Sequence, residues 1–165
     1  MDMERNINQA KPMEPDTVEL RRLDAIDDQI MPLMVEAERD GHRFVRRLND
    51  NWLSGRNRFD KPGEFLLGAY ANNRLVAIGG LNRDPYAQSD DVGRLRHLYV
   101  RADSRRLGVG RLLVRQIVIE AAKTFSVLRL RTATADAAAF YERLGFATTG
   151  DDTATHIVRL PTILS

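Results

Sequence analysis

The chain contains 165 residues, of which 43% are hydrophobic and 29% charged, enough for one domain with a sizeable core. Its formal net charge of +2 requires neither nucleic acid nor an acidic membrane surface as a partner. The sequence has no cysteine, which excludes disulfides, thiolate metal sites and a cysteine nucleophile. Residues 1–16 contain no apolar run of signal-peptide length, and nowhere are there eighteen consecutive apolar residues, so we expect a cytoplasmic protein with no membrane partner.

The N-terminal part predicts a tail followed by a single domain. Residues 1–16 are polar and contain two prolines, which is typical of a flexible segment, so the domain is expected over 17–165. Alternating apolar residues in TVELRRL predict a first strand. Between Asp28 and Ser54, apolar residues recur at helical spacing in two runs that end at Gly41 and Gly55, which predicts two short helices.

The middle of the chain predicts a hairpin and then alternating strands and helices. GEFLLGAY and RLVAIGGL are separated by ANN, whose Asn72 and Asn73 tolerate the positive φ of a tight hairpin turn. A hairpin followed by β-α-β crossovers predicts an α/β fold with a mixed sheet covered by helices. The remaining elements are expected as a strand over 93–100, a helix over 109–125, a strand over 127–133, a helix over 137–144 and one or two final strands, including 155–160.

The segment RRLGVG, Arg105 to Gly110, opens the third predicted helix and favours an anion site. The first turn of a helix has unpaired N–H groups and the positive end of the dipole, and the two glycines let a ligand come close to the backbone. No Gly-Lys-Ser/Thr follows, and Leu113 stands where the dinucleotide fingerprint needs a third glycine. A tight strand-to-helix turn with solvated arginines is the alternative interpretation.

Two stretches, HLYVRADSRRLGVGRLLV and AAAFYERLGF, together resemble the GNAT superfamily of acyltransferases. The resemblance covers roughly 93–146. It implies the GNAT fold, in which a central mixed, mostly antiparallel sheet is flanked by helices. It also implies an N-acetyltransferase that moves the acetyl group of acetyl-coenzyme A directly to an amine, with no metal.

The resemblance also implies where the coenzyme binds. The helix-opening pattern of the family is Arg/Gln-x-x-Gly-x-Gly/Ala, and its backbone N–H groups hold the pyrophosphate. The preceding strand binds the pantetheine arm as if the arm were an added strand. Many relatives carry asparagine where this chain has Thr134. The implied cofactor-binding residues are Leu98, Tyr99, Val100, Arg105, Arg106, Leu107, Gly108, Val109, Gly110, Arg111 and Thr134.

Attack by an amine on a thioester needs a stabilised oxyanion and a proton for the departing thiolate. Tyr141 matches the tyrosine that protonates the coenzyme sulfur in many family members, so the resemblance implies that it is the catalytic acid. On spacing alone, Phe140 and Tyr141 are core aromatics of an amphipathic helix. For the oxyanion, the resemblance implies a backbone N–H near Val100.

The general base is where this sequence departs from the family, because Arg94 stands where many relatives carry a glutamate. His97, His156, a water molecule or no base at all are the alternatives. Arg94 and Arg96 alternate along the predicted strand, which suits either a solvated face or a grip on a substrate carboxylate.

Two other functions are compatible with the sequence. A non-catalytic acyl-coenzyme A sensor or regulatory module would keep RRLGVG but have no use for Tyr141. A basic nucleic-acid binder would use the arginines in RFVRRLNDNWLSGRNR, but helical spacing explains the apolar residues there as core, so no nucleic acid is expected. The acceptor, a small-molecule or peptide amine, is left open, as are the acyl-chain preference and the oligomeric state, a homodimer included.

Overall fold

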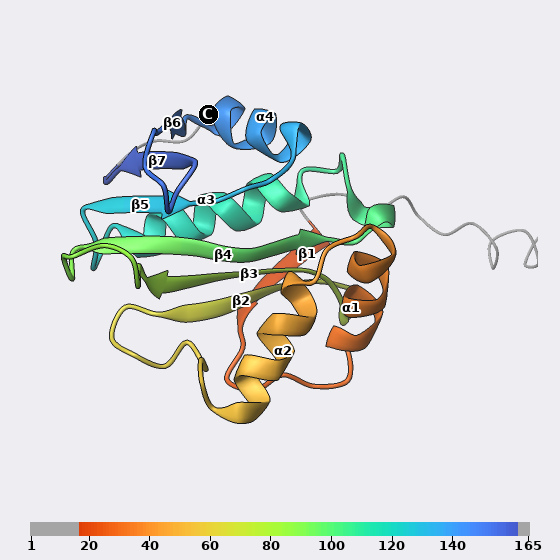
Figure 1. Cartoon of the computed structure of the whole chain (residues 1–165). Coiled ribbons are helices and arrows are strands. Elements are labelled where there is room, and N and C mark those ends of the chain that lie inside the picture. Colours follow the sequence, from red (N-terminus) through yellow and green to blue (C-terminus); the bar gives the residue numbers. More distant parts are fainter. Residues whose placement is uncertain (1–16, 162–165) are drawn as a thin grey trace, which may run out of the picture.

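The computed structural model describes residues 17–161, and the tail predicted over 1–16 lies outside them. A seven-stranded sheet forms the centre of the domain, with α1 and α2 on one face and α3 and α4 on the other (Figure 1). The elements are β1 (Val18–Arg22), α1 (Ile30–Arg39), α2 (Phe44–Ser54), β2 (Phe65–Ala71), β3 (Arg74–Arg83), β4 (Val92–Val100), the 3₁₀ turn η2 (Ala102–Ser104), α3 (Val109–Ala121), β5 (Val127–Leu130), α4 (Ala135–Leu144), β6 (Ala147–Thr148) and β7 (His156–Arg159).

The strand order is β1-β2-β3-β4-β5-β7-β6, and only β4 and β5 run parallel within this sheet. The predicted α/β class with a mixed, mostly antiparallel sheet is therefore confirmed. The predicted hairpin is also confirmed, because Ala71 pairs with Arg74 across Asn72 and Asn73, whose φ angles are 51° and 62°. Positive φ at both central residues is the geometry of a type I′ turn, which matches the twist of the flanking strands.

β4 and β5 pair only at their beginnings. Val92, Gly93 and Arg94 are opposite residues 127–129, and from Leu95 onward β4 pairs on that side with no strand of residues 17–161. Figure 1 shows β5 alongside only the first part of β4. We call residues 95–100 on the side facing β5 the open edge of β4. An unpaired strand edge leaves backbone donors and acceptors available to a ligand or to water.

A buried carboxylate lies at the point where these strands part. Arg94 and Arg129 form the last register pair, and both guanidinium groups contact the same Asp84 oxygen, at 3.3 and 3.1 Å. The Asp84 side chain is fully buried. A second nitrogen of Arg94 donates to the Thr153 carbonyl at 2.9 Å, which ties the loop before β7 to the same point.

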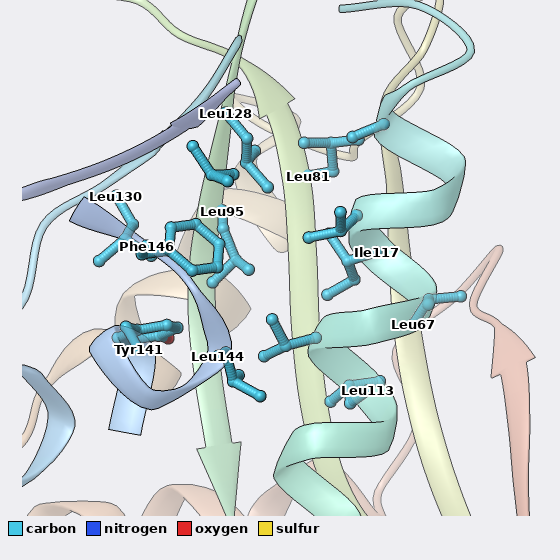
Figure 2. Close-up of a cluster of buried hydrophobic side chains, with 14 of the residues drawn as sticks. Leu67, Leu81, Leu95, Leu113, Ile117, Leu128, Leu130, Tyr141, Leu144 and Phe146 are labelled. Atoms are coloured by element: carbon cyan, nitrogen blue, oxygen red, sulfur yellow. The ribbon is translucent and has the colours of Figure 1, made fainter. Parts of the chain in front are cut away.

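Each face of the sheet carries its own apolar core. Leu67 of β2 belongs to the core under α3 and α4, whereas its neighbour Leu66 belongs to the core under α1 and α2, as the pleat of a strand requires. Figure 2 shows the first of these cores, in which Leu113 and Ile117 of α3 and Tyr141 of α4 point toward the sheet. The site described below therefore rests on close-packed side chains.

Some element ends differ from the sequence prediction. The helix expected over 109–125 ends at Ala121, because the next N–H groups of Lys123 and Thr124 bond to carbonyls only three residues back. The strand expected over 127–133 ends at Leu130, since the Thr132 N–H donates to the Thr155 side chain instead of to a strand. Among residues 17–161, no helix combines the length and apolar character needed to span a bilayer.

Candidate active site

The end of β4 directs backbone groups toward the open edge. The Arg101 N–H donates to the Val76 carbonyl of β3 at 2.8 Å. Because hydrogen-bonding direction alternates along an antiparallel strand, the N–H and C=O of Val100 face away from β3. The Val100 carbonyl accepts a bond from Arg105 Nε at 2.9 Å, and its N–H is left facing the open edge.

A β-bulge interrupts β4 at His97, whose φ is +60°. Gly80 pairs with Arg96 and Ile78 with Tyr99, so that His97 and Leu98 share Gly79 as their single opposite residue. His97 contacts Phe44 of α2, whereas Leu98 packs against the core under α3. The bulge therefore places the Arg96 and His97 side chains on the α2 face in succession, and normal alternation resumes at Leu98, just before the end of the open edge.

The RRLGVG segment presents a row of free backbone donors. Arg106 has a φ of +64° and Gly108, which caps α3, a φ of +81°. The N–H groups from Arg106 to Arg111 make no hydrogen bond to any acceptor within the described part of the chain. Adjacent N–H groups at the positive end of a helix form an anion-binding site.

The Arg105 side chain is committed elsewhere. Besides bonding the Val100 carbonyl, its guanidinium lies 3.2 Å from Asp40 at the end of α1 and 3.1 Å from the Tyr99 hydroxyl. Arg105 therefore ties the loop to β4 and α1, and these contacts favour a structural role for its side chain. The exposed Arg106 and Arg111 have no ion pair within residues 17–161 and are free to meet a ligand.

Tyr99 supports the site from the opposite face of the sheet. Its buried hydroxyl donates to Glu36 of α1 at 3.1 Å, and the same carboxylate accepts the Ala102 N–H at 2.5 Å. Burial and the nearby Glu36 raise the pKa of Tyr99. Since its side chain lies against α1 and its backbone pairs with Ile78, Tyr99 places no group on the open edge.

Apolar side chains lie between Tyr141 and the free N–H groups of residues 106–111, which we call the donor row. Gly110 is packed so closely that a Cβ on it would lie 3.3 Å from Val100 and 3.4 Å from the Phe140 ring. β4, the start of α3 and α4 therefore converge there. The partly exposed apolar residues that pack on the core around this point are Leu98, Val100, Leu107, Ala137 and Phe140.

Tyr141 lies in the core beside Phe146 (Figure 2). Its ring is edge-to-face against Phe140 and Phe146, at centroid distances of 5.1 and 5.5 Å. Its hydroxyl makes no hydrogen bond with any described residue. The oxygen nevertheless retains some exposure to solvent. Burial raises the pKa of Tyr141. The phenol therefore keeps its proton across the neutral range.

The two candidate histidines differ in environment. His97 is buried against Phe59, its Nδ1 donates to the Phe44 carbonyl at 3.0 Å, and burial lowers its pKa to about 3. His156 contacts Thr155 through Nδ1 at 2.9 Å and Glu142 through Nε2 at 3.4 Å. His97 is therefore neutral at physiological pH, and its buried Nε2 has no partner in the described part of the chain.

Two other predicted positions have local partners. Arg94 is held by Asp84 and Thr153, so it is neither on a solvated face nor free for a substrate carboxylate. The Thr134 hydroxyl accepts the Ala137 N–H at 3.1 Å and caps α4. Within residues 17–161, no three His, Asp or Glu side chains gather closely enough to hold a metal ion.

The model of the acetyltransferase (GNAT) family matches residues 21–146. The chain belongs to the GNAT acetyltransferase family. Its structure resembles that of a provisionally named acetyltransferase from an Exiguobacterium species, with 29% identity, a TM-score of 0.78 and coverage of 86% of this chain and 93% of the other. No curated protein matches it in sequence.

Two more distant structures share the fold of this GNAT protein. A GNAT-family protein from Desulfovibrio desulfuricans has 20% identity and a TM-score of 0.66 over 86% of this chain and 98% of the other. The GNAT family N-acetyltransferase YhbS from Escherichia coli, solved in complex with CoA, has 16% identity and a TM-score of 0.65 over 93% of this chain and 86% of its own.

Sequence reasoning missed the bulge at His97 and the partners of Arg105 in this GNAT acetyltransferase. Consecutive glycines, Gly79 and Gly80, on the facing strand were a signal for the bulge, because glycine within a strand often marks one. No local sequence pattern predicts the contacts of Glu36 and Asp40 with Tyr99 and Arg105, because these residues are about sixty positions apart in the sequence.

Burial of neutral His97 predicts a specific dependence of stability on pH. The unfolded chain binds a proton at this residue near pH 6.5 and the folded chain only near pH 3, so stability falls as pH drops through that window. Asn accepts a positive φ and retains a donor for Phe44. Between pH 7 and 4.5, urea unfolding should show wild type losing about 2.5 kcal/mol more than His97→Asn. Parallel losses would contradict a buried neutral imidazole.

Proposed function

We propose that this GNAT acetyltransferase transfers the acetyl group of acetyl-coenzyme A to an amine acceptor by direct transfer. The observation that carries the proposal is the row of free N–H groups from Arg106 to Arg111 beside the open edge of β4. A pyrophosphate needs several donors at once, and the start of a helix supplies them. The E. coli structure of the same fold is in complex with CoA, which supports this choice of ligand.

The coenzyme is proposed to bind along these groups. Its pyrophosphate accepts bonds from the N–H groups of Leu107 to Arg111, with Arg106 and Arg111 adding positive charge. An exposed charge at a helix end contributes only about 0.3–1 kcal/mol, so the amides supply most of the binding. The pantetheine arm bonds to the open edge as an added strand and packs on Leu107, Ala137 and Phe140.

Two groups of this chain are proposed to assist the reaction. The Val100 N–H faces the open edge and stabilises the negative charge that develops on the thioester oxygen when the amine attacks. The C–S bond then breaks, Tyr141 gives its proton to the departing thiolate, and the proton that the attacking nitrogen loses as the amide forms returns through water to the Tyr141 oxygen. The phenol is protonated at neutral pH and its oxygen retains access to solvent. Burial raises its pKa and makes it a weaker acid, so the transfer is proposed to occur only as negative charge develops on the sulfur.

The amine must lose a proton before it attacks, and we propose that water takes it. His97 is a poor base at neutral pH because burial lowers its pKa to about 3. Freeing a lysine-like amine of pKa about 10.4 at pH 7 costs roughly 4.6 kcal/mol, whereas an α-amine of pKa about 8 costs nearer 1.4 kcal/mol. The site therefore favours acceptors whose amine has a low pKa.

Two substitutions at Gly110 test the coenzyme site. Gly110→Ala adds only a Cβ in contact with Val100 and Phe140, while Gly110→Asp adds the same Cβ and a negative charge beside the donor row. Calorimetry should show Gly110→Asp weakening acetyl-coenzyme A at least 10-fold, a loss of about 1.4 kcal/mol, with Gly110→Ala within about three-fold of wild type. Wild-type affinity in a folded Gly110→Asp variant would place the coenzyme elsewhere.

Tyr141→Phe tests the proton donor, because it retains the packed ring and removes a hydroxyl that bonds to none of the described residues. With an acceptor found by screening amines for thiol release, kcat should fall by about 10²–10⁴, while the Kd for acetyl-coenzyme A changes by less than about three-fold.

Tyr70→Phe, in the core under α1 and α2, is the matched control and should leave kcat unchanged. An unchanged kcat in Tyr141→Phe would make Tyr141 a core aromatic only. A wild-type protein that binds acetyl-coenzyme A but acetylates no amine would instead fit a sensor module.

A further inference from the structure

Arg96 is a half-buried cation that has no counter-ion among residues 17–161. It lies in the middle of β4 opposite Gly80, and its guanidinium makes no ion pair or hydrogen bond with any described residue. Burial and two neighbouring arginines, Arg94 and Arg47, lower its pKa. Removing a guanidinium from water without a partner is unfavourable, so this position weakens the fold unless something else uses the charge.

The surroundings of Arg96 are positive. Arg94 lies two residues away on the same strand, and the exposed Arg47 comes from α2 and makes no ion pair within residues 17–161. The nearby carboxylate, Asp84, is fully buried and already shared by Arg94 and Arg129. The described residues therefore provide no free anion for Arg96, and an added anion would meet Arg96 and Arg47 together.

Arg96 is also open to a ligand. The unpaired side-chain nitrogens of Arg96 retain exposure to solvent, whereas Nε2 of the next residue, His97, is fully buried. A guanidinium presents parallel N–H donors that match the oxygens of a carboxylate or phosphate. Arg96 can therefore accept an incoming anion without rearrangement of the fold.

The position of Arg96 relates it to the proposed reaction. The bulge separates it from Leu98, which returns to the α3 face at the open edge. Along a strand, two residues separate backbone positions by about 7 Å. Arg96 therefore belongs to the strand whose open edge is proposed to hold the thioester, and its side chain can meet a molecule that reaches this edge.

We propose that Arg96, together with Arg47, binds an anionic group of the amine acceptor, either a carboxylate or a phosphate. This proposal rests on the proposed function, because it assigns the second substrate of that site. It gives the acceptor a chemical class, a primary amine that also carries an acidic group. Arg96 is then a specificity-determining residue.

Matched acceptors test the proposal. The common amino acids are compared with their amides, and phosphoethanolamine with ethanolamine, by thiol release from acetyl-coenzyme A. For the anionic members, Arg96→Gln should raise KM about 10- to 100-fold with kcat changed less than about three-fold, as expected for lost charge-assisted bonds. The neutral members should keep their KM. The pair whose anionic member has the lower KM in wild type shows whether the bound group is a carboxylate or a phosphate.

Arg115→Gln, which removes an exposed arginine from α3, is the control and should leave every KM unchanged. The melting temperature of Arg96→Gln should be no lower than that of wild type, because a half-buried unpaired charge is lost. An equal KM rise for anionic and neutral members, or no rise for either, would overturn the assignment.

Direct binding decides the case in which no member of the panel is acetylated. Calorimetry on enzyme saturated with coenzyme A should then show anionic amines binding to wild type and at least 10-fold more weakly to Arg96→Gln. Absence of such binding would overturn the proposal. Failure of acetyl-coenzyme A itself to bind is measured separately and would count against the proposed function.

Discussion

The contact of Asp84 with Arg94 and Arg129 sets the geometry on which the site depends. These arginines are the last residues at which β4 and β5 pair, and one buried carboxylate holds both. Removing one partner from a buried ion pair of this kind costs about 3–5 kcal/mol of stability. The point at which β4 and β5 separate, which we call the split, is therefore held firmly in place. Beyond it the strands separate, and the polar backbone of β4 becomes available.

The open edge is supported from both faces of the sheet. On one face, α3 brings its free N–H groups and α4 brings Phe140 and Tyr141 toward the end of β4. On the other, Glu36 and Asp40 of α1 hold Tyr99 and Arg105. Arg105 links the two by bonding the Val100 carbonyl, which fixes the adjacent N–H toward the split. The donor row and the proposed oxyanion donor are thus positioned by one network.

The same strand separates the two substrates in the proposed reaction. Leu98 and Val100 pack toward α3, where the coenzyme is proposed to bind, whereas His97 faces α2. The bulge at His97 produces this change of side over a single residue. A bulge next to a site where bonds form is a recurrent way to redirect a side chain.

Local pattern was enough to predict the order of the elements, the Asn72–Asn73 turn and the free helix start at RRLGVG, because each depends on residues close in sequence. The GNAT family, inferred from two motifs, is confirmed by the match over residues 21–146. The partners of Arg94 and Arg105 could not be predicted, since Asp84, Thr153 and Asp40 reach them only after the chain folds. The assignments of Tyr141 and of the coenzyme-binding residues stay predictions.

Amide hydrogen exchange resolved by residue tests the central claim most directly, because the claim concerns backbone donors that have no partner in the described chain. On saturation with acetyl-coenzyme A, the N–H groups of Leu107 to Arg111 and of Val100 should become protected, while those of the β2–β3 hairpin keep their rates. Protection confined to other segments, with the coenzyme bound and these amides still exchanging at their free rates, would contradict the assignment of the open edge and the start of α3 as the coenzyme site.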